Sequence, residues 1–91
     1  MQAKKTFFFA VVTPVNRVKG SGFETGVKVK ATSPAEALEI AKISFRTYAG
    51  DGDVNLDVWT RKDYNAIIQH ITLAARDQER ASRKPVAHTV I

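Results

Sequence analysis

Six consecutive apolar residues, FFFAVV at positions 7–12, decide the fold of this chain. All but one are aromatic or β-branched, and the run is too short to span a membrane. A run of this kind is typical of a strand that is buried on both faces. It ends at Thr13-Pro14 without the small-residue pattern of a signal-peptide cleavage site. We therefore predict that residues 7–12 form the central strand of a sheet.

The next apolar segment has a different pattern, because apolar and polar residues alternate along positions 23–31. Alternation with a period of two predicts a strand with one apolar and one basic face. The residues between the two strands, TPVNRVKGSG at 13–22, have the composition of a connecting loop. The two strands are therefore expected to form a hairpin with a long loop. Its basic side chains are Lys28 and Lys30 on the second strand and Arg17 and Lys19 in the loop.

A strong capping signal, SPAE at 33–36, predicts the start of a helix. Ser33 can accept a hydrogen bond from the amide three residues later, and Glu36 can reach back to the amide of Ser33. Apolar residues then recur at helical spacing as far as Tyr48, and glycines follow at positions 50 and 52.

The second half of the chain predicts one further strand and one further helix. Residues 54–59 alternate between apolar and polar types, as a half-buried strand does. Residues 60–63 can cap a second helix, which is expected to continue to Lys84 and to end before Pro85. The apolar stripe of this helix would contain Tyr64, Ile67, Ile68, Ile71 and Ala75.

The predicted fold is a single α+β domain over residues 1–91, with the element order β-β-α-β-α. It consists of a three-stranded antiparallel sheet with two helices packed on it. The first strand is expected in the middle, because it is apolar on both faces. Residues 85–91 form either a loose tail or a short added strand, and the sequence leaves both alternatives open.

The charge of the chain is concentrated in its N-terminal third. The chain has 91 residues and a formal net charge of +5. Residues 1–32 carry six basic side chains and one acidic side chain, whereas residues 33–91 carry eight of each. Such an asymmetry bears on partners and encounter rates. It predicts an acidic partner that meets the hairpin.

The basic strand is the first candidate binding surface, because aromatic rings and lysines on one sheet face can stack bases and hold phosphates. Trp59 would share that face and add stacking if it is exposed; alternatively the second helix covers the face and Trp59 belongs to the core. The loop cations and the C-terminal basic run are also candidates. Their alternatives are a solvated loop tip and complementation of the helix dipole. The full candidate set is Arg17, Lys19, Lys28, Lys30, Lys4, Lys5, Trp59, Arg80, Arg83 and Lys84.

No motif predicts catalysis, a cofactor or a metal. Cysteine is absent, which excludes disulfides, Cys-ligated zinc and thiol catalysis. The carboxylates of Asp51, Asp53 and Asp57 lack the final glutamate of a calcium loop. His70 and His88 stand in no metal-binding or nucleophile–base spacing. We therefore expect a protein that is not an enzyme.

The plan of the chain resembles that of the small phage anti-CRISPR proteins. The resemblance rests on Lys28 and Lys30 on a strand, on the SPAE helix start at 33–36, and on a third strand after the Gly-Asp-Gly turn at 50–52. It implies binding to a guide-RNA surveillance complex and blocking of target DNA. Many such inhibitors are acidic DNA mimics, whereas a basic one has to contact guide RNA, DNA or an acidic protein surface.

The function expected from these observations is non-enzymatic binding of nucleic acid or of a nucleoprotein complex through the N-terminal hairpin. Its most specific form is inhibition of CRISPR interference in the cytoplasm of a host cell. The alternatives are a protein-only adaptor or oligomerisation module and a stand-alone RNA- or DNA-binding domain. No membrane partner is expected. The choice between RNA, DNA and acidic protein stays open, as does the oligomeric state.

Overall fold

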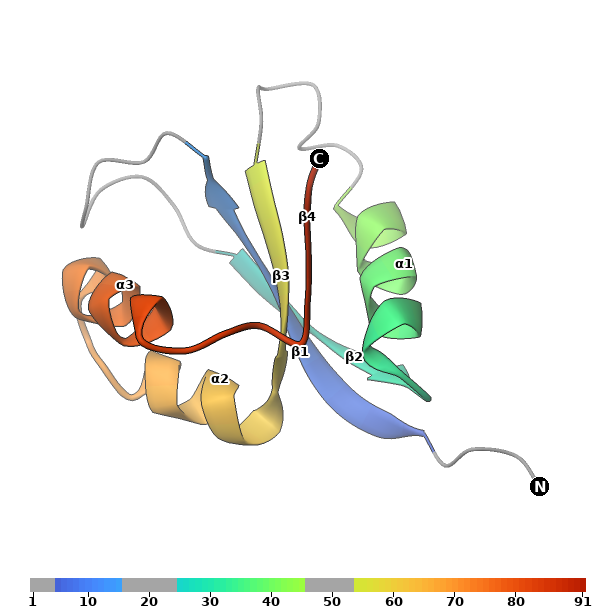
Figure 1. The fold of residues 1–91 in the computed structure, drawn as a ribbon, viewed down its shortest axis with the longest axis horizontal. Helices are drawn as coiled ribbons and strands as arrows, with labels where there is room; N and C mark the ends of the chain where they lie inside the picture. The colour runs from blue at the N-terminus through green and yellow to red at the C-terminus, as the bar shows by residue number, and fades with distance from the viewer. Residues whose placement is uncertain (1–4, 16–24, 46–53) are drawn as a thin grey trace.

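A computed structural model describes three parts of the chain, residues 5–15, 25–45 and 54–91. Their strands form one sheet in which every neighbouring pair is antiparallel and the order is β2-β1-β3-β4 (Figure 1). The strands are β1 (Thr6–Pro14), β2 (Thr25–Ala31), β3 (Val54–Thr60) and β4 (Ala87–Val90). The predicted hairpin pairing of the first two strands and the internal position of the first strand are confirmed.

Helix α1 (Pro34–Ser44) begins at the predicted cap. The Ser33 hydroxyl accepts a hydrogen bond from the amide of Glu36 at 3.1 Å. The Glu36 carboxylate, expected to reach the amide of Ser33, instead accepts from the amide and the hydroxyl of Thr32, at 3.3 and 2.9 Å. The Ser33 hydroxyl is engaged by the amide of Glu36, whereas both the amide and the hydroxyl of Thr32 donate to the carboxylate of Glu36. The helix ends at Ser44, with Phe45 as its C-cap, and so stops short of the predicted Tyr48. Tyr48 and the glycines predicted to end the helix lie outside the described residues.

Helix α1 covers one face of the sheet and forms the main core with it (Figure 1). Ala37 and Ala41 of α1 are fully buried, and their small side chains allow the helix to lie close to the strands. The sheet side of this core is made of aliphatic residues without accessible surface: Ala10, Val12, Ala31, Leu56 and Val58.

The predicted second helix is in fact two helices on the opposite face, α2 (Arg61–Ile68) and α3 (Leu73–Ala81) (Figure 1). The break has two physical causes. Thr72 caps α3 by accepting a hydrogen bond from the amide of Ala75 at 3.2 Å. The Arg76 side chain donates to the carbonyls of His70 and Ile68, which α2 leaves unpaired at its end. Ile71, expected in the apolar stripe, is therefore 95% exposed in the connection.

The C-terminus forms a strand rather than a loose tail. Strand β4 pairs with β3, and the backbone of Ile91 exchanges two hydrogen bonds with Val54, at 2.9 and 3.0 Å. The sheet therefore has four strands instead of the predicted three, and three helices are present in the described parts instead of two. The α+β class and the antiparallel sheet are as predicted. None of these helices is long and apolar enough to cross a membrane.

Candidate functional site

The sheet face opposite α1 carries the polar and basic side chains of the strands. Strand register aligns Phe9 of β1 with Lys28 on one side and with Trp59 on the other, so the three residues share this face. Lys30 lies on the same face, opposite Phe7. The prediction that Trp59 and the two lysines point to one side is therefore confirmed.

Helix α2 covers the middle of this face and buries Trp59. The ring of Tyr64 stacks on Phe9 with a centroid separation of 4.4 Å and an interplanar angle of 8°. Ile67 packs with Val11 and Trp59 in a second, smaller core, and Trp59 is 1% exposed. The ring is therefore covered, and Trp59 is not accessible for the base stacking that was expected if it were exposed.

The ring that remains accessible beside the lysines is that of Phe7, which is 39% exposed. The ammonium of Lys28 lies 4.6 Å from the centroid of this ring, and that of Lys30 lies 5.6 Å from it. Both distances are within the range of cation–π attraction. We call Phe7, Lys28 and Lys30 the hairpin cluster. Within the described ranges, neither lysine has a carboxylate at ion-pair distance.

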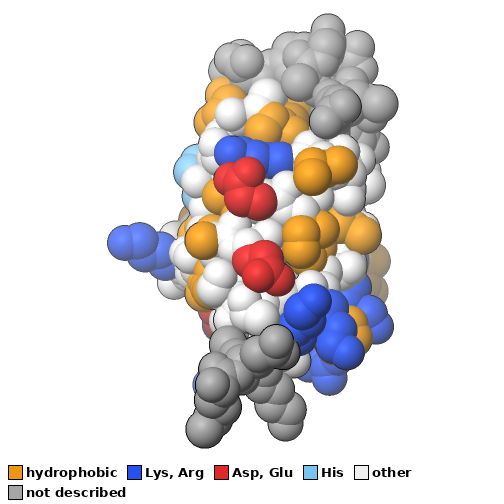
Figure 2. Space-filling model, turned by 90° about the vertical axis from the view of Figure 1, so that its right-hand side faces the viewer, with side chains coloured by type: hydrophobic (Ala, Val, Ile, Leu, Met, Phe, Trp, Pro, Cys, Tyr) orange, Lys and Arg blue, Asp and Glu red, His pale blue; other side chains and the backbone are white. Residues whose placement is uncertain are grey.

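Further cations lie at the same end of the sheet. Thr60 pairs with Phe8, so the first turn of α2 begins beside the hairpin cluster. Arg61 and Lys62 of that turn are exposed, as is Lys5. Basic side chains gather at the lower right of Figure 2. Sequence reasoning had not singled out Arg61 and Lys62, although a basic pair in the first turn of a helix is a usable signal, because the dipole disfavours cations there.

The C-terminal arginines are engaged within the protein. Arg83 donates to Asp63 of α2 at 2.8 Å and to Glu79 of α3 at 2.9 Å. Arg80 pairs with Asp77 at 2.8 Å, and its side chain is 12% exposed. Lys84 is exposed beyond the end of α3. Arg80 thus has a contact within α3, whereas the contact of Arg83 with Asp63 links the end of α3 to α2. The role of both arginines in binding stays a prediction.

The ion pairs around Glu79 change two pKa values. A hydrogen bond from His70 at 3.0 Å, followed by one from Arg83, lowers the pKa of Glu79 below its ordinary 4.5. The hydrogen bond to Glu79 raises the pKa of Arg83, which burial opposes. Both shifts favour the charged forms, so this cluster links α3 to α2 at neutral pH.

Three further candidates, Lys4, Arg17 and Lys19, lie outside the described residues. Both histidines have carboxylate partners, because His88 lies 2.6 Å from Asp57 and His70 contacts Glu79. In the described parts of the chain, no three histidine or carboxylate side chains are grouped so that they could hold a metal ion.

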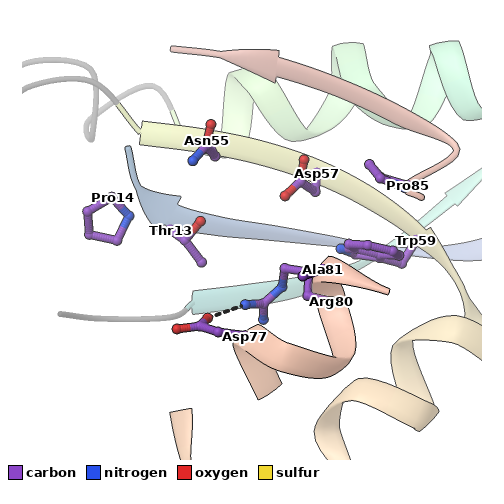
Figure 3. A pocket seen from close by; sticks show the side chains of 9 residues that line it. All are labelled: Thr13, Pro14, Asn55, Asp57, Trp59, Asp77, Arg80, Ala81 and Pro85. Atoms are coloured by element: carbon purple, nitrogen blue, oxygen red, sulfur yellow. Dashed lines mark hydrogen bonds and ion pairs between the residues drawn. The ribbon is translucent and has the colours of Figure 1, made fainter. Parts of the chain in front are cut away.

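A hollow of ≈ 440 Å³ separates α3 from the sheet (Figure 3). Its walls come from the C-terminal end of β1, from the polar side of β3, from α3 and from the segment that leads to β4. The lining residues are Thr13, Pro14, Asn55, Asp57, Trp59, Asp77, Arg80, Ala81 and Pro85. Sequence reasoning missed this hollow because it predicted a single continuous helix. The polar residues Asn55 and Asp57 on an otherwise buried strand were the only available signal.

Comparison of the chain with family models, with curated proteins and with solved structures gave no match.

Proposed function

We propose that this protein is a non-catalytic binding protein that holds the phosphate backbone of a nucleic acid, alone or in a nucleoprotein complex, at the hairpin end of its sheet. The observation that carries the proposal is the hairpin cluster. Two lysines on an edge strand flank an accessible phenylalanine ring, at 4.6 and 5.6 Å from its centroid.

The cluster suits phosphates and bases together. Lysine ammonium groups bind phosphates as point charges, and a ring at the surface offers a face on which a base can stack. The ring also holds the two ammonium groups near each other, although their like charges repel. Phe7 thus supplies the ring for base stacking, the role that the sequence had assigned to Trp59.

The first turn of α2 supports the same proposal. Cations at the N-terminus of a helix are unfavourable by about 0.3–1 kcal/mol each. Arg61 and Lys62 are exposed, and no carboxylate in the described ranges pairs with them. Helix stability therefore does not explain these two cations, whereas an anionic partner at this end of the sheet does.

The test compares two substitutions that reverse the same charge at different places. Lys28→Glu alters the hairpin cluster, and Lys42→Glu alters α1 on the other side of the sheet, where Lys42 pairs with Glu39 at 3.2 Å. Binding to a labelled single-stranded RNA and to a DNA duplex is measured by fluorescence anisotropy over a range of salt concentrations. The proposal predicts that Lys28→Glu weakens binding about tenfold or more and lowers the salt slope by about 1, while Lys42→Glu has little effect.

Equal losses in the two variants would mean that net charge alone matters. An absence of binding at low salt to both nucleic acids would overturn direct nucleic-acid binding.

The most specific form of this proposal is inhibition of CRISPR interference. It rests on the resemblance of the chain's plan to anti-CRISPR proteins and on its basic hairpin. The expected result is that the protein restores transformation by a plasmid targeted by a CRISPR system, and that Lys28→Glu loses this effect. Failure to protect the plasmid against the systems of the native host would reject this form and leave the binding assay to decide the general one.

A further inference from the structure

The hollow between α3 and the sheet has features that neither the fold nor the hairpin cluster requires. Helix α3 contacts α2 and is held by the ion pairs of Arg83, but a gap of ≈ 440 Å³ remains between it and the strands. This volume is in the range of small-molecule sites. A gap in a domain this small removes packing contacts that close approach of α3 would have provided.

The strongest evidence for an occupant is the indole of Trp59. The side chain is 1% exposed, and its Nε1 atom has no hydrogen-bond partner among the described residues. In Figure 3 the nitrogen end of the indole is directed toward the hollow and toward Arg80. A buried donor without a partner costs about 1–3 kcal/mol. An occupant with a hydrogen-bond acceptor would remove this cost.

The charges of the walls favour a neutral occupant. Asp77 is 2.8 Å from Arg80, and Asp57 is 2.6 Å from His88, so each carboxylate already has a cationic or histidine partner. With two carboxylates and one guanidinium, the lining repels a free phosphate rather than attracting one.

The hydrogen-bonding groups specify the occupant further. Trp59 supplies a donor, whereas Asp57 and Asn55 supply acceptors on the same strand. A carboxylate can accept several hydrogen bonds, so the contact with His88 does not exhaust Asp57. Pro14, Pro85 and Ala81 add apolar surface at the rim. The matching ligand is neutral, has apolar faces, and carries an acceptor and a donor on its edge.

We propose that this hollow binds a single nucleobase, with an acceptor on the edge of the base facing Trp59 Nε1 and a donor facing Asp57 or Asn55. Proteins that take up an unstacked base read it by hydrogen bonds to its edge within a closely fitting pocket. The base is either that of a free nucleoside or an unpaired base of a nucleic acid. The inference does not depend on the hairpin cluster, because it concerns the base and not the phosphates.

The test uses the fact that Trp59 is the sole tryptophan of the chain. Its indole N–H therefore gives one side-chain signal in a ¹H–¹⁵N correlation spectrum, and this signal reports directly on the hollow. The full chain is titrated with adenosine, guanosine, cytidine and uridine, each to about 10 mM, which detects affinities in the millimolar range. Ribose 5-phosphate and inorganic phosphate are the comparison ligands. We expect a saturable shift of the indole signal with at least one nucleoside and none with the two phosphates.

Two substitutions on α3 provide the matched control. Ala81→Phe puts a ring into the hollow, whereas Ala74→Phe puts the same ring on an exposed position of the same helix. Neither removes a buried side chain, and their thermal unfolding midpoints are compared first. Ala81→Phe is expected to weaken nucleoside binding about tenfold or more, and Ala74→Phe to leave it unchanged.

Several outcomes would overturn the inference. An indole signal that no nucleoside moves would mean that water alone satisfies Nε1, and an equal response to ribose 5-phosphate would mean that the base is not recognised. Comparison of a short oligonucleotide with its abasic form then separates the two sources of the base. Loss of the shift with the abasic form identifies a base within a nucleic acid, whereas a response to free nucleosides without one to the oligonucleotide identifies the nucleoside. The nucleoside titration contains no phosphate backbone, so its result is independent of the binding assay with Lys28→Glu. Either experiment can fail while the other succeeds.

Discussion

The two faces of the sheet are built from the same strands but are covered in different ways. The face under α1 is an aliphatic core in which Ala10, Leu56 and Val58 have no accessible surface. The opposite face has a small core of Val11, Trp59 and Ile67, which α2 covers. On either side of that core lie the hairpin cluster and the hollow under α3.

The difference separates the main core, which lies on the α1 face, from the proposed binding surfaces, which lie on the opposite face. Side chains alternate between the two faces along each strand, so β1 and β3 contribute to both. The α1 face is closed and holds most of the buried apolar residues. The other face keeps lysines, carboxylates and a buried indole N–H, which add little to folding. Substitutions on the two faces should therefore have different effects.

The largest expected effect is at the centre of the α1 face. Leu56→Ala removes a fully buried side chain from the larger core. The free energy of unfolding is expected to fall by about 4 kcal/mol, because truncation leaves a cavity that the sheet cannot collapse to fill. Urea denaturation monitored by circular dichroism measures this loss. A loss below about 1 kcal/mol, the level of an ordinary surface change, would contradict the account of the core.

A smaller effect is expected on the opposite face, where two isoleucines form a matched pair. Ile67 is 2% exposed and packs against Trp59, whereas Ile71 is 95% exposed between α2 and α3. Ile67→Ala should cost about 3 kcal/mol and Ile71→Ala less than about 0.5 kcal/mol. Urea denaturation monitored by circular dichroism measures both losses. Similar losses at both positions would indicate one continuous helix from Tyr64 onward, as the sequence pattern alone predicts.

The smallest effect is local and depends on pH. The pKa of Glu79 is lowered below 4.5 in the folded protein, so its stabilising contribution is complete above pH 4.5 and is lost as the pH falls through the folded value. Amide exchange in α3 should therefore accelerate in acid before exchange in α1 does. Glu79→Gln should remove most of this difference between the helices. If α1 and α3 lose protection together in the native protein, the ion-pair cluster is not what holds α3.

Much of the fold follows from local sequence signals. The apolar run at 7–12, the alternation at 54–59, and the caps at Ser33 and Thr60 predict elements that the structure contains. In each case a rule that involves only neighbouring residues predicts the element, and no contact with a distant residue overrides it. Burial on both faces places the first strand inside the sheet, and a side-chain acceptor begins each helix.

The features that sequence reasoning missed depend on contacts between distant residues. The break at Ile71 is stabilised by Arg76, whose side chain reaches carbonyls six and eight residues earlier. For residues 85–91 the sequence left a loose tail and a short added strand open, because four residues carry too little pattern to decide. Strand β4 forms because β3 offers it an edge. The hollow exists because α3 is a separate helix. For the proposed binding surface, Lys28 and Lys30 were singled out from the sequence. Only the strand register and the burial under α2 show that Phe7, and not Trp59, is the accessible ring beside them.

The central claim is that the hairpin end of the sheet, and not the α1 side, meets a nucleic acid. The most direct test is a ¹H–¹⁵N correlation spectrum of the full chain, recorded at low salt while a short single-stranded RNA is added. The account predicts that the largest shifts fall on Phe7, Lys28, Lys30 and the first turn of α2, while the amides of α1 stay in place. Shifts that map to α1, or a spectrum that the RNA leaves unchanged, would contradict it.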